Sequence, residues 1–509
     1  MDFQSLPFLV ISTFLFIMLV LFNLGYKTRR ARGSALPLPP GPRKLPIIGN
    51  MHQLVGGLPH HVLRDMSMKH GPLMLLQLGE VPTIIVSSPE IAKEVMKTHD
   101  ANFSDRPYFL ASRIMSYDSK GLVISPCGDY WRQMRKLSVQ ELLSVKRVQS
   151  FRSIREEEMA NLVRTIQEKA GQQVNFSEKI FAWTYSVTAR AAFGKKVARQ
   201  DEFINLITES TRLSSGFDIA DMFPSVKILS RLSPMRPKLE KLHKQVDEIL
   251  QGLIDSHVEH LSKNTAERDA QEGLLDVLLH FRRTGNEFDI TLTDDHIKAV
   301  TLDLYSAASE TSSSTVEWAM SEMLKNPNVM TRAQEEVRQV LDTKGKMDET
   351  CLEDLHYLKA VIKETLRLHP PAPLLAPRES REKCEINGYQ IPAKMRVLVN
   401  AYAIGRDPGY WNDADSFIPE RFLNSKMDYK GLDFEYIPFG AGRRICPGMW
   451  MAMVNVALPL SQMLCRFDWS LANGCEIDML EGAGFTVRRK SDLILIPTPY
   501  HHDYNKFSL

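Results

Sequence analysis

The chain contains 509 residues and has a mass of 58.0 kDa, a length that allows about three domains of ordinary size. Hydrophobic residues make up 44% and charged residues 24% of it, which is ordinary for a chain that buries a core. This composition argues against a disordered chain, a collagen and a many-span membrane protein. The 63 Lys and Arg residues nearly balance the 61 Asp and Glu residues, and a net charge of +2 gives no reason to expect a nucleic-acid partner.

The first predicted element is an apolar run at residues 6–22, LPFLVISTFLFIMLVLF, which is followed by Lys27, Arg29, Arg30 and Arg32. A run of about 17 apolar residues is the shortest that crosses a bilayer as a helix. Because basic flanks stay on the cytosolic side, we expect one transmembrane helix with its N-terminus in the lumen. The alternative is a cleaved signal peptide, but the chain lacks the basic residues that normally precede the apolar run of such a peptide.

A proline-rich segment follows, with prolines at positions 37, 39, 40, 42 and 46. Proline fixes φ and stiffens an extended chain, so this segment is predicted to be a semi-rigid spacer. We therefore divide the chain into a membrane anchor at 1–26, a basic flank and proline-rich hinge at 27–46, and one large domain at 47–509.

The large domain is predicted to be mostly α with a small β portion. Apolar runs at 73–78 and 83–87 are separated by Gly79 and Pro82 and predict a β-hairpin. From Pro89 onward helical periodicity dominates. Helices are predicted at 89–99, 129–144, 147–169, 177–193, 201–214, 236–262, 272–283, 293–325, 328–341 and 355–369, and further strands near 396–400 and 492–497.

The predicted helix at 293–325 is unusually long, with Thr293 as its N-cap and Pro327 just beyond its end. At a rise of about 1.5 Å per residue it would cross nearly the whole domain. Residues 305–315 in its middle are small or polar, which would let another group approach the backbone closely. An ordinary helix softened by Ser and Thr and packed against a second helix is an equal alternative.

The strongest signal lies at residues 438–448, where Phe439, Gly442, Arg444, Cys446 and Gly448 match the pattern F-x-x-G-x-R-x-C-x-G. The glycines allow a tight turn whose backbone N–H groups can face a sulfur and stabilise a thiolate. The proline after the cysteine is predicted to start a helix, which would place the sulfur near its positive end. The pattern therefore predicts an axial thiolate ligand.

The chain has five other cysteines, at positions 127, 351, 384, 465 and 475. Because there is no C-x-x-C pair, a disulfide scaffold and a zinc-ribbon site are improbable, and the pattern suits a reducing compartment. A buried structural thiol is the expected role of a lone cysteine, and we assign that role to these five.

Together with two further motifs, the cysteine motif resembles the cytochrome P450 family over essentially the whole chain. Glu364 and Arg367 match E-x-x-R, and Arg421 lies in P-E-R-F at residues 419–422. A lone E-x-x-R would be weak, because such pairs are common on solvated helix faces. The resemblance implies a cytochrome P450 fold in which Glu364, Arg367 and Arg421 form a buried, structural ionic triad.

The resemblance also implies haem b as the cofactor, with Cys446 as the axial ligand of its iron. It assigns cofactor binding to Trp131, Arg135, Arg378, Phe439, Arg444 and Gly448. Trp131 and Arg135 would serve one side of the haem propionates, and Arg378 and Arg444 the other. For Arg132 and Lys136 two interpretations stay open: a solvated helix face, or a basic surface that binds an acidic reductase.

Residues 307–312, A-A-S-E-T-S, resemble the oxygen-activating motif of the family. Glu310 and Thr311 hold its acid and alcohol positions and would act as the catalytic proton relay. Ala308 stands where the family usually has Gly, and we expect this to alter substrate fit and not to abolish oxygen chemistry. The resemblance implies O₂ as a substrate and electrons from NADPH through a separate NADPH–cytochrome P450 reductase.

Segments 52–66, 71–81, 128–136 and 385–408 resemble plant microsomal terpene hydroxylases such as the limonene hydroxylases and premnaspirodiene oxygenase, and an alkaloid hydroxylase acting on tabersonine is similar too. The resemblance implies a small hydrophobic substrate, first a terpenoid and second an alkaloid or phenolic. The expected pocket residues are Phe109, Leu110, Ile114, Leu302, Tyr305, Ala308, Ala372, Leu374, Leu375, Phe485 and Thr486.

The implied protein is a single-pass enzyme of the endoplasmic reticulum membrane whose catalytic domain faces the cytosol. One alternative is a haem-thiolate isomerase or dehydratase that needs no oxygen, but such family members tend to lose the Glu–Thr pair. A second alternative is a non-enzymatic haem binder, against which the apolar pocket segments and the anchor argue. Cys446 in its full motif argues against a purely structural membrane protein.

Overall fold

The computed structural model describes residues 36–197, 199–214, 218–263, 273–284, 291–472 and 476–500. The predicted membrane span, most of the basic flank and Cys475 lie outside these residues. No helix among the described residues is long and apolar enough to cross a membrane. The described cysteines are all free of disulfide bonds, as the cysteine pattern predicts.

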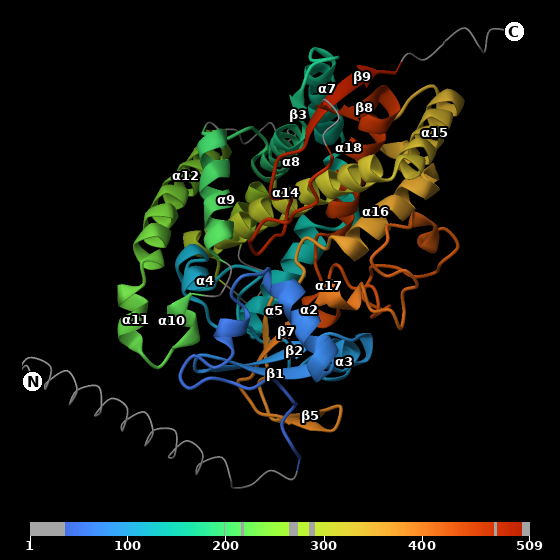
Figure 1. The fold of residues 1–509 in the computed structure, drawn as a ribbon. Coiled ribbons are helices and arrows are strands. Elements are labelled where there is room, and N and C mark those ends of the chain that lie inside the picture. Colours follow the sequence, from blue (N-terminus) through green and yellow to red (C-terminus); the bar gives the residue numbers. More distant parts are fainter. Residues whose placement is uncertain are drawn as a thin grey trace, which may run out of the picture.

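Helices dominate the fold (Figure 1). In chain order they are η1 (Met51–Gln53), α2 (Pro59–His70), α3 (Pro89–Lys93), η2 (Glu94–Thr98), α4 (Leu110–Met115), α5 (Asp129–Leu137), η3 (Ser138–Leu142), α6 (Val145–Ser150), α7 (Arg152–Gln167), α8 (Phe176–Phe193), α9 (Gln200–Leu213), α10 (Ile219–Met222), α11 (Lys227–Leu232), α12 (Met235–Lys263), α13 (Leu274–Thr284), α14 (Asp294–Lys325), α15 (Pro327–Lys344), η4 (Glu349–Asp354), α16 (His356–Leu368), α17 (Ala401–Ile404), η5 (Pro419–Phe422), η6 (Gly442–Arg444) and α18 (Met449–Arg466).

The strands form three small sheets. The predicted hairpin is confirmed as antiparallel β1 (Leu73–Leu78) and β2 (Val81–Val86). Strand β2 pairs in parallel with β7 (Arg396–Val399), and β4 (Arg378–Glu379) completes this four-stranded sheet. The other two sheets are β3 (Val174–Asn175) with β9 (Ile494–Pro499) and β8 (Phe467–Leu471), and the hairpin of β5 (Cys384–Ile386) with β6 (Tyr389–Ile391).

The long predicted helices are confirmed. Those at 177–193, 201–214, 236–262 and 293–325 correspond to α8, α9, α12 and α14 within one residue at each end. The predicted helices at 129–144 and 147–169 are each divided, into α5 with η3 and into the end of α6 with α7.

Several elements were missed by the periodicity, above all α2 and the full length of α18. Helix α18 is buried along most of its length and contains Pro459, so it presents no polar stripe from which a helical period could be read. Its start was predicted at Pro447, and in the structure it begins two residues later, at Met449.

Helix α14 is the central element of the helical part and packs against α8, α16 and α18 (Figure 1). Thr293 and His296 form a reciprocal capping box at its start. In its middle, the hydroxyls of Ser309 and Ser313 donate to the carbonyls of Tyr305 and Ser309, at 2.8 and 2.9 Å. These bonds satisfy the small polar side chains that lie in the core.

The proline-rich segment lies on the sheets. The backbone N–H of Leu75 in β1 donates to the Pro40 carbonyl at 2.7 Å, and that of Gln390 in β6 donates to Pro37 at 2.8 Å. A Cβ atom at Gly41 would lie 2.0 Å from the Leu75 carbonyl oxygen, so this approach requires glycine. The described part of the predicted hinge is therefore fixed to the folded domain.

Candidate functional site

The segment before α18 folds into a tight turn that carries Cys446. Gly440 and Gly442 both have a φ of +69°, and a Cβ atom at Gly442 would lie 2.1 Å from the Met96 carbonyl oxygen. The backbone N–H of Cys446 donates to the Phe439 carbonyl at 3.0 Å. Only glycine fits these two positions, so the local sequence fixes where the sulfur lies.

Burial raises the pKa of the Cys446 thiol, while a hydrogen bond from the Gly448 backbone N–H and the nearby Arg135 guanidinium act in the opposite direction. A buried thiol of this kind becomes a thiolate when a metal cation binds to the sulfur and releases the proton. The Gly448 N–H and the Arg135 guanidinium both stabilise negative charge on the sulfur, as the surroundings of a metal-binding thiolate must.

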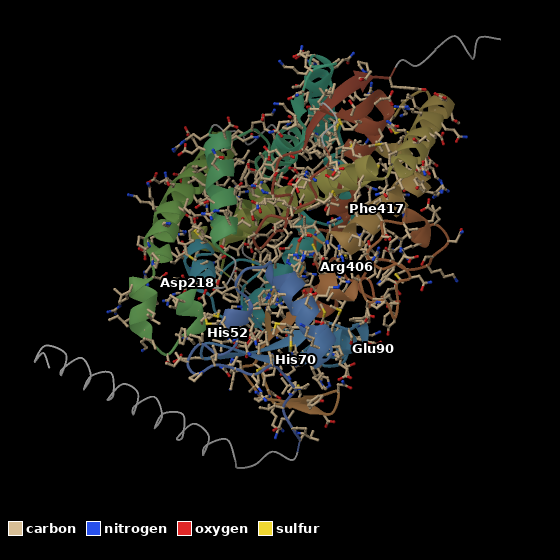
Figure 2. All side chains as sticks on the ribbon, in the orientation of Figure 1. His52, His70, Glu90, Asp218, Arg406 and Phe417 are labelled. Atoms are coloured by element: carbon tan, nitrogen blue, oxygen red, sulfur yellow. The ribbon has the colours of Figure 1, made fainter. Side chains whose placement is uncertain are left out.

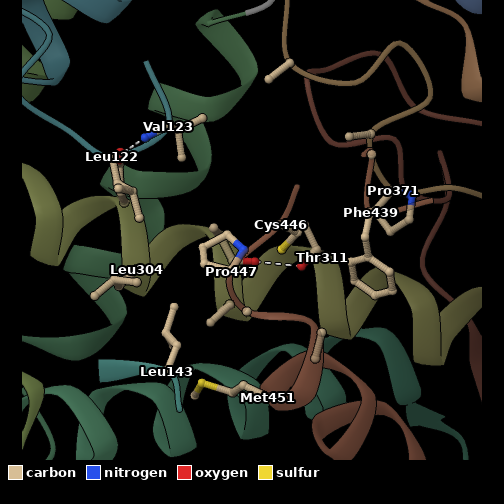
Figure 3. Close-up of a pocket in the computed structure, with 18 of the residues that line it drawn as sticks. Leu122, Val123, Leu143, Leu304, Thr311, Pro371, Phe439, Cys446, Pro447 and Met451 are labelled. Atoms are coloured by element: carbon tan, nitrogen blue, oxygen red, sulfur yellow. Dashed lines mark hydrogen bonds between the residues drawn. The ribbon is translucent and has the colours of Figure 1, made fainter. Parts of the chain in front are cut away.

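The sulfur faces a largely apolar cavity that lies between this turn and helix α14 (Figure 3). The apolar part of the lining includes Leu122, Val123, Leu143, Leu304, Ala308, Ala372, Leu375, Met451 and Phe485. On the α14 side, Thr311 lines the cavity and its hydroxyl donates to the Ala307 carbonyl at 2.6 Å. The cavity is therefore lined by a thiol from the turn and by a hydroxyl from α14.

Four guanidinium groups line the same cavity, those of Arg106, Arg135, Arg378 and Arg444. Arg444 donates from Nε to the Ser104 carbonyl at 2.8 Å and from Nη2 to the Ser125 carbonyl at 2.6 Å. Its Nη1 atom is buried and has no hydrogen-bond partner among the described residues. An unpaired buried donor beside other guanidinium groups fits the carboxylate of a bound anionic cofactor.

Arg106 was not predicted, although it lies in this group. It donates to the carbonyls of Ala376 and Pro377 at 2.7 and 2.6 Å. Burial lowers the pKa of Arg106 well below its usual range, and the neighbouring Arg444 and Arg378 lower it further. No spacing rule marks this residue in the sequence, because the four cations come together only in the fold.

Trp131 lies beside these cations. Its indole N–H donates to the Leu122 carbonyl at 3.2 Å, and the Arg444 guanidinium lies 3.9 Å from the centre of its ring. Trp131 therefore positions Arg444 through a cation–π contact. Arg135 donates to the Ile445 carbonyl at 2.5 Å, directly before Cys446.

Below the cavity, the structure brings Glu364, Arg367 and Arg421 together. Arg367 donates two bonds of 2.7 Å to Glu364, and Arg421 donates a third of 3.2 Å. Arg367 also donates to the carbonyls of Gly405, Ala414 and Ser416. Both Glu364 and Arg367 are fully buried, and these bonds supply the closure that a buried ion pair needs.

Glu310 and Thr311 are neighbours on α14 and line two different cavities. Thr311 faces the Cys446 cavity, whereas Glu310 lines a second cavity with Thr211, Thr486 and Arg488. Burial raises the pKa of Glu310 to about 7, while Arg488 and Thr211 oppose this rise. The carboxyl can therefore exchange a proton near neutral pH.

Comparison with known proteins identifies the family. The cytochrome P450 family model matches residues 39–496. This chain belongs to the cytochrome P450 family. P450s are haem b-binding monooxygenases and draw electrons from NADPH through a partner reductase.

Curated relatives of this P450 span nearly its full length. Cytochrome P450 71D10 of Glycine max is 54% identical, with 96% of each chain covered. Tabersonine 16-hydroxylase 2 of Catharanthus roseus is 52% identical, covering 96% of this chain and 97% of the relative. Premnaspirodiene oxygenase of Hyoscyamus muticus is 50% identical, covering 97% and 98%.

A solved structure has the same fold. A zebra fish cytochrome P450 determined with abiraterone superposes with a TM-score of 0.74 at 24% identity, covering 87% of this chain and 99% of the other. The fold prediction is thereby confirmed as a mostly helical P450 fold with a small sheet portion.

The structure divides the expected pocket residues of the P450 among several places. Ala308, Ala372, Leu375 and Phe485 line the Cys446 cavity. Leu110 and Ile114 line a separate cavity beside α10 and α11, Leu374 packs in the core around β1 and β2, and Thr486 lies with Glu310 in the second cavity. The ring of Phe109 lies 4.7 Å from the Arg396 guanidinium.

Leu302 and Tyr305 lie on the wrong face of α14 to line the cavity. Both are in the core that packs around α8 and α9, where Tyr305 stacks on Phe203 with ring centres 4.8 Å apart. Leu304 lines the cavity in their place. Ala308 and Thr311, which follow Leu304 at helical spacing, line the same cavity.

Asp303 is another lining residue that the sequence did not reveal. Its carboxylate accepts a hydrogen bond of 2.9 Å from the Val123 backbone N–H. Burial raises the pKa of Asp303 to about 6, and the bonds from Val123 and Leu122 oppose the rise. A Cβ atom at Gly121 would lie 2.5 Å from this carboxylate, so the segment 121–123 is held closely against α14.

Proposed function

We propose that this P450 hydroxylates a small hydrophobic plant specialised metabolite, with a terpenoid as the first choice and an alkaloid or phenolic as the second. O₂ is the oxidant, and NADPH supplies electrons through a cytochrome P450 reductase. The observation that carries the proposal is the apolar cavity between the Cys446 thiol and the Thr311 hydroxyl.

In this proposal Cys446 ligates the haem iron and Arg378 and Arg444 hold the propionates, with Arg106, Arg135 and Trp131 as neighbours. Phe439 and Gly448 complete the cradle on the cysteine side. Bound haem supplies a thiolate-ligated iron that activates oxygen for insertion into a C–H bond. The unpaired Nη1 atom of Arg444 supports the fit of an anionic group at this edge of the cavity.

The protein's own catalytic task is to deliver protons into a dry cavity. Glu310 takes up a proton at the second cavity, whose lining includes the exposed Arg212. Thr311 then presents a hydroxyl to the Cys446 cavity, held in place by its bond to Ala307. A carboxyl with a pKa near 7 suits this relay at cytosolic pH, because both protonation states are populated.

The lining favours an uncharged substrate. Asp303 is the one carboxylate among the lining residues of the described chain, and its oxygens serve the backbone of the segment 121–123. A protonated alkaloid would have to compete with this backbone segment for the one carboxylate, whereas a terpenoid needs no counter-charge. The similarity to premnaspirodiene oxygenase agrees with this choice, and the similarity to tabersonine 16-hydroxylase 2 keeps the alkaloid as the second candidate.

The test is turnover of a substrate panel by microsomes that contain the full chain and a P450 reductase. We expect NADPH-dependent hydroxylation of one or more terpenoids. Exclusive turnover of an alkaloid or a phenolic would contradict the terpenoid choice, and product formation without NADPH would indicate an isomerase or dehydratase. In the Thr311→Ala variant we expect haem to stay bound while most NADPH is consumed without product.

For the cellular location we propose an anchor at 1–26, a hinge at 27–46 and a catalytic domain at 47–509 on the cytosolic side of the endoplasmic reticulum. The apolar run at 6–22 and its basic flank support this layout. The full chain should stay in the membrane pellet after alkaline carbonate extraction. Release of the full chain by carbonate would contradict the anchor.

A further inference from the structure

Two imidazoles that do not line the Cys446 cavity meet at a single carboxylate oxygen of a third residue. His60 and His61 lie in the first turn of α2, and Glu481 lies in the segment that precedes β9. The Nε2 atoms of His60 and His61 lie 2.7 and 2.9 Å from the same oxygen, Oε2 of Glu481. The potential ligand atoms of these three residues all lie within 4.8 Å of one another.

The cluster is buried on one side and open on the other. The side chain of His60 is 3% exposed and that of Glu481 9%, whereas that of His61 is 43% exposed. Burial lowers the pKa of His60, while the neighbouring Glu481 opposes this shift. Burial tends to raise the pKa of Glu481, but the nearby imidazoles of His369, His60 and His61 outweigh it and hold that pKa well below its usual range.

A second carboxylate and a third imidazole lie directly behind this cluster. The Nε2 atom of His369 lies 2.7 Å from Glu322. Its Nδ1 atom is buried without a hydrogen-bond partner among the described residues and lies 3.9 Å from Glu481 Oε1. The ring of His369 is fixed by stacking on Trp318, with ring centres 4.1 Å apart.

Arg406 is a cation beside α17 (Figure 2) whose charge acts on Glu481. Its Nε lies 3.2 Å from Asp415 and its guanidinium lies 3.8 Å from the centre of the Tyr402 ring, while its Nη1 is buried without a hydrogen-bond partner among the described residues. A single guanidinium does not balance the two buried carboxylates Glu481 and Glu322, and a divalent cation at the imidazoles would add the missing charge.

We propose that His60, His61 and Glu481 form a binding site for a divalent transition-metal ion of the zinc class, separate from the haem iron. Two imidazole nitrogens and one carboxylate oxygen are a ligand set that Zn²⁺ prefers, and the exposed side of His61 leaves room for a water ligand. His369 lies behind Glu481 as an outer-shell partner of the carboxylate.

The present distances need only a small adjustment. Neighbouring ligand atoms in a tetrahedral zinc site lie about 3.3 Å apart, as bond lengths near 2.0–2.1 Å dictate. The contacts of 2.7 and 2.9 Å must therefore open by about half an ångström. The exposed His61 ring, which stacks on Tyr402 at 4.6 Å, can open its own contact, and the His60 contact opens if the Glu481 carboxylate turns away from the buried imidazole.

A metal at this site would connect α2 to segments that line the P450 cavity. Glu481 precedes the lining residue Phe485 by four positions, and His369 precedes the lining residue Pro371 by two. The Val487 backbone N–H donates to the Pro371 carbonyl at 2.8 Å and joins the two segments.

The test is Zn²⁺ binding to the purified, haem-loaded full chain prepared without a histidine tag. Isothermal titration with ZnCl₂ should give one ion per chain, and X-ray absorption at the zinc edge should show nitrogen and oxygen ligands near 2.0–2.1 Å without sulfur. The His61→Ala variant should bind Zn²⁺ at least about tenfold more weakly. Because His61 is exposed, we expect this variant to fold. An unchanged haem spectrum checks that it does.

Two further variants sharpen the test. Glu481→Gln should lose Zn²⁺ in the same way, whereas His70→Ala, at the far end of α2 (Figure 2), should bind it like the original chain. Absence of Zn²⁺ binding, full binding by His61→Ala, or sulfur ligands in the absorption spectrum would each overturn the proposal.

Discussion

The two sides of the Cys446 cavity are held by different kinds of contact. The name floor is used for the turn that carries Cys446 together with the segments around Glu364, Arg367 and Arg421. The name wall is used for residues 121–123 together with the part of α14 that faces them. In the floor, Glu364 accepts from two arginines and from the Ile418 backbone, and Arg367 donates to three further carbonyls. In the wall, the Asp303 carboxylate accepts from the Val123 backbone N–H, Arg106 donates to the Val123 carbonyl at 3.0 Å, and Trp131 donates to the Leu122 carbonyl at 3.2 Å.

This difference indicates separate roles for the two sides. In the floor, removal of Glu364 or Arg367 leaves a fully buried charge without its main partner. The wall is held by separate side-chain bonds to single backbone atoms, so its side chains can change without loss of the fold and can set which substrate fits. The floor should therefore control folding and haem retention, and the wall should control selectivity.

The largest expected effect comes from breaking the floor. Arg367→Leu leaves Glu364 buried without its main partner, and we expect a loss of about 3–5 kcal/mol in the free energy of unfolding, with loss of haem. Denaturant unfolding and haem content measure both effects.

The matched control is Arg212→Leu, because Glu209 and Arg212 form an E-x-x-R pair of the same spacing whose side chains are 41% and 60% exposed. This variant should lose no more than about 1 kcal/mol. Equal losses in the two variants would remove the distinction between the floor and an ordinary surface pair.

A smaller effect on the free energy of unfolding is expected at Glu310, which lies behind the wall. Because burial raises its pKa from 4.5 to about 7, the folded state holds this proton more tightly than the unfolded state. The resulting stability is fully present below about pH 4.5 and is lost as the pH rises through 7, by at most about 3 kcal/mol. Glu310→Gln should remove this fall in stability with rising pH. Denaturant unfolding of both chains, measured from pH 4.5 to pH 8, checks the prediction. An unchanged pH profile in the variant would show that Glu310 titrates normally.

The smallest effect is expected in the wall itself. Asp303→Ala removes the acceptor for the Val123 backbone, and we expect a loss of about 1–3 kcal/mol in the free energy of unfolding. Because Leu122 and Val123 line the cavity, the ratio of hydroxylated products should also change. Asp295→Ala, on the same helix but in an exposed pair with Lys120, should leave that ratio unchanged. An unaltered product ratio in Asp303→Ala would contradict the role of the wall in selectivity.

The sequence was informative about the floor because its chemistry is carried by fixed spacings. The cysteine motif, E-x-x-R and P-E-R-F identify Cys446, Glu364, Arg367 and Arg421 without knowledge of the fold. The bounds of α14 were also predictable, because Thr293 caps its start and Asn326-Pro327 ends it.

The wall could not be read in the same way. The middle of α14 has small and polar residues around its whole circumference, so its pattern does not say which face is toward the cavity. Leu302 and Tyr305 were therefore predicted to line the cavity, whereas in the structure Leu304 lines it. Asp303 and the His60–Glu481 contact depend on residues that are far apart in sequence, and only the fold brings them together.

The central claim is that Cys446 is the thiolate ligand of a haem in this cavity, and one spectrum tests it most directly. The full chain, reduced and exposed to carbon monoxide, should give the absorption band of a thiolate-ligated ferrous–CO haem. Cys446→Ala should abolish this band, while Cys465→Ala, at a buried cysteine in the core, should retain it. A normal thiolate band in Cys446→Ala would show that the ligand is elsewhere and would contradict the account.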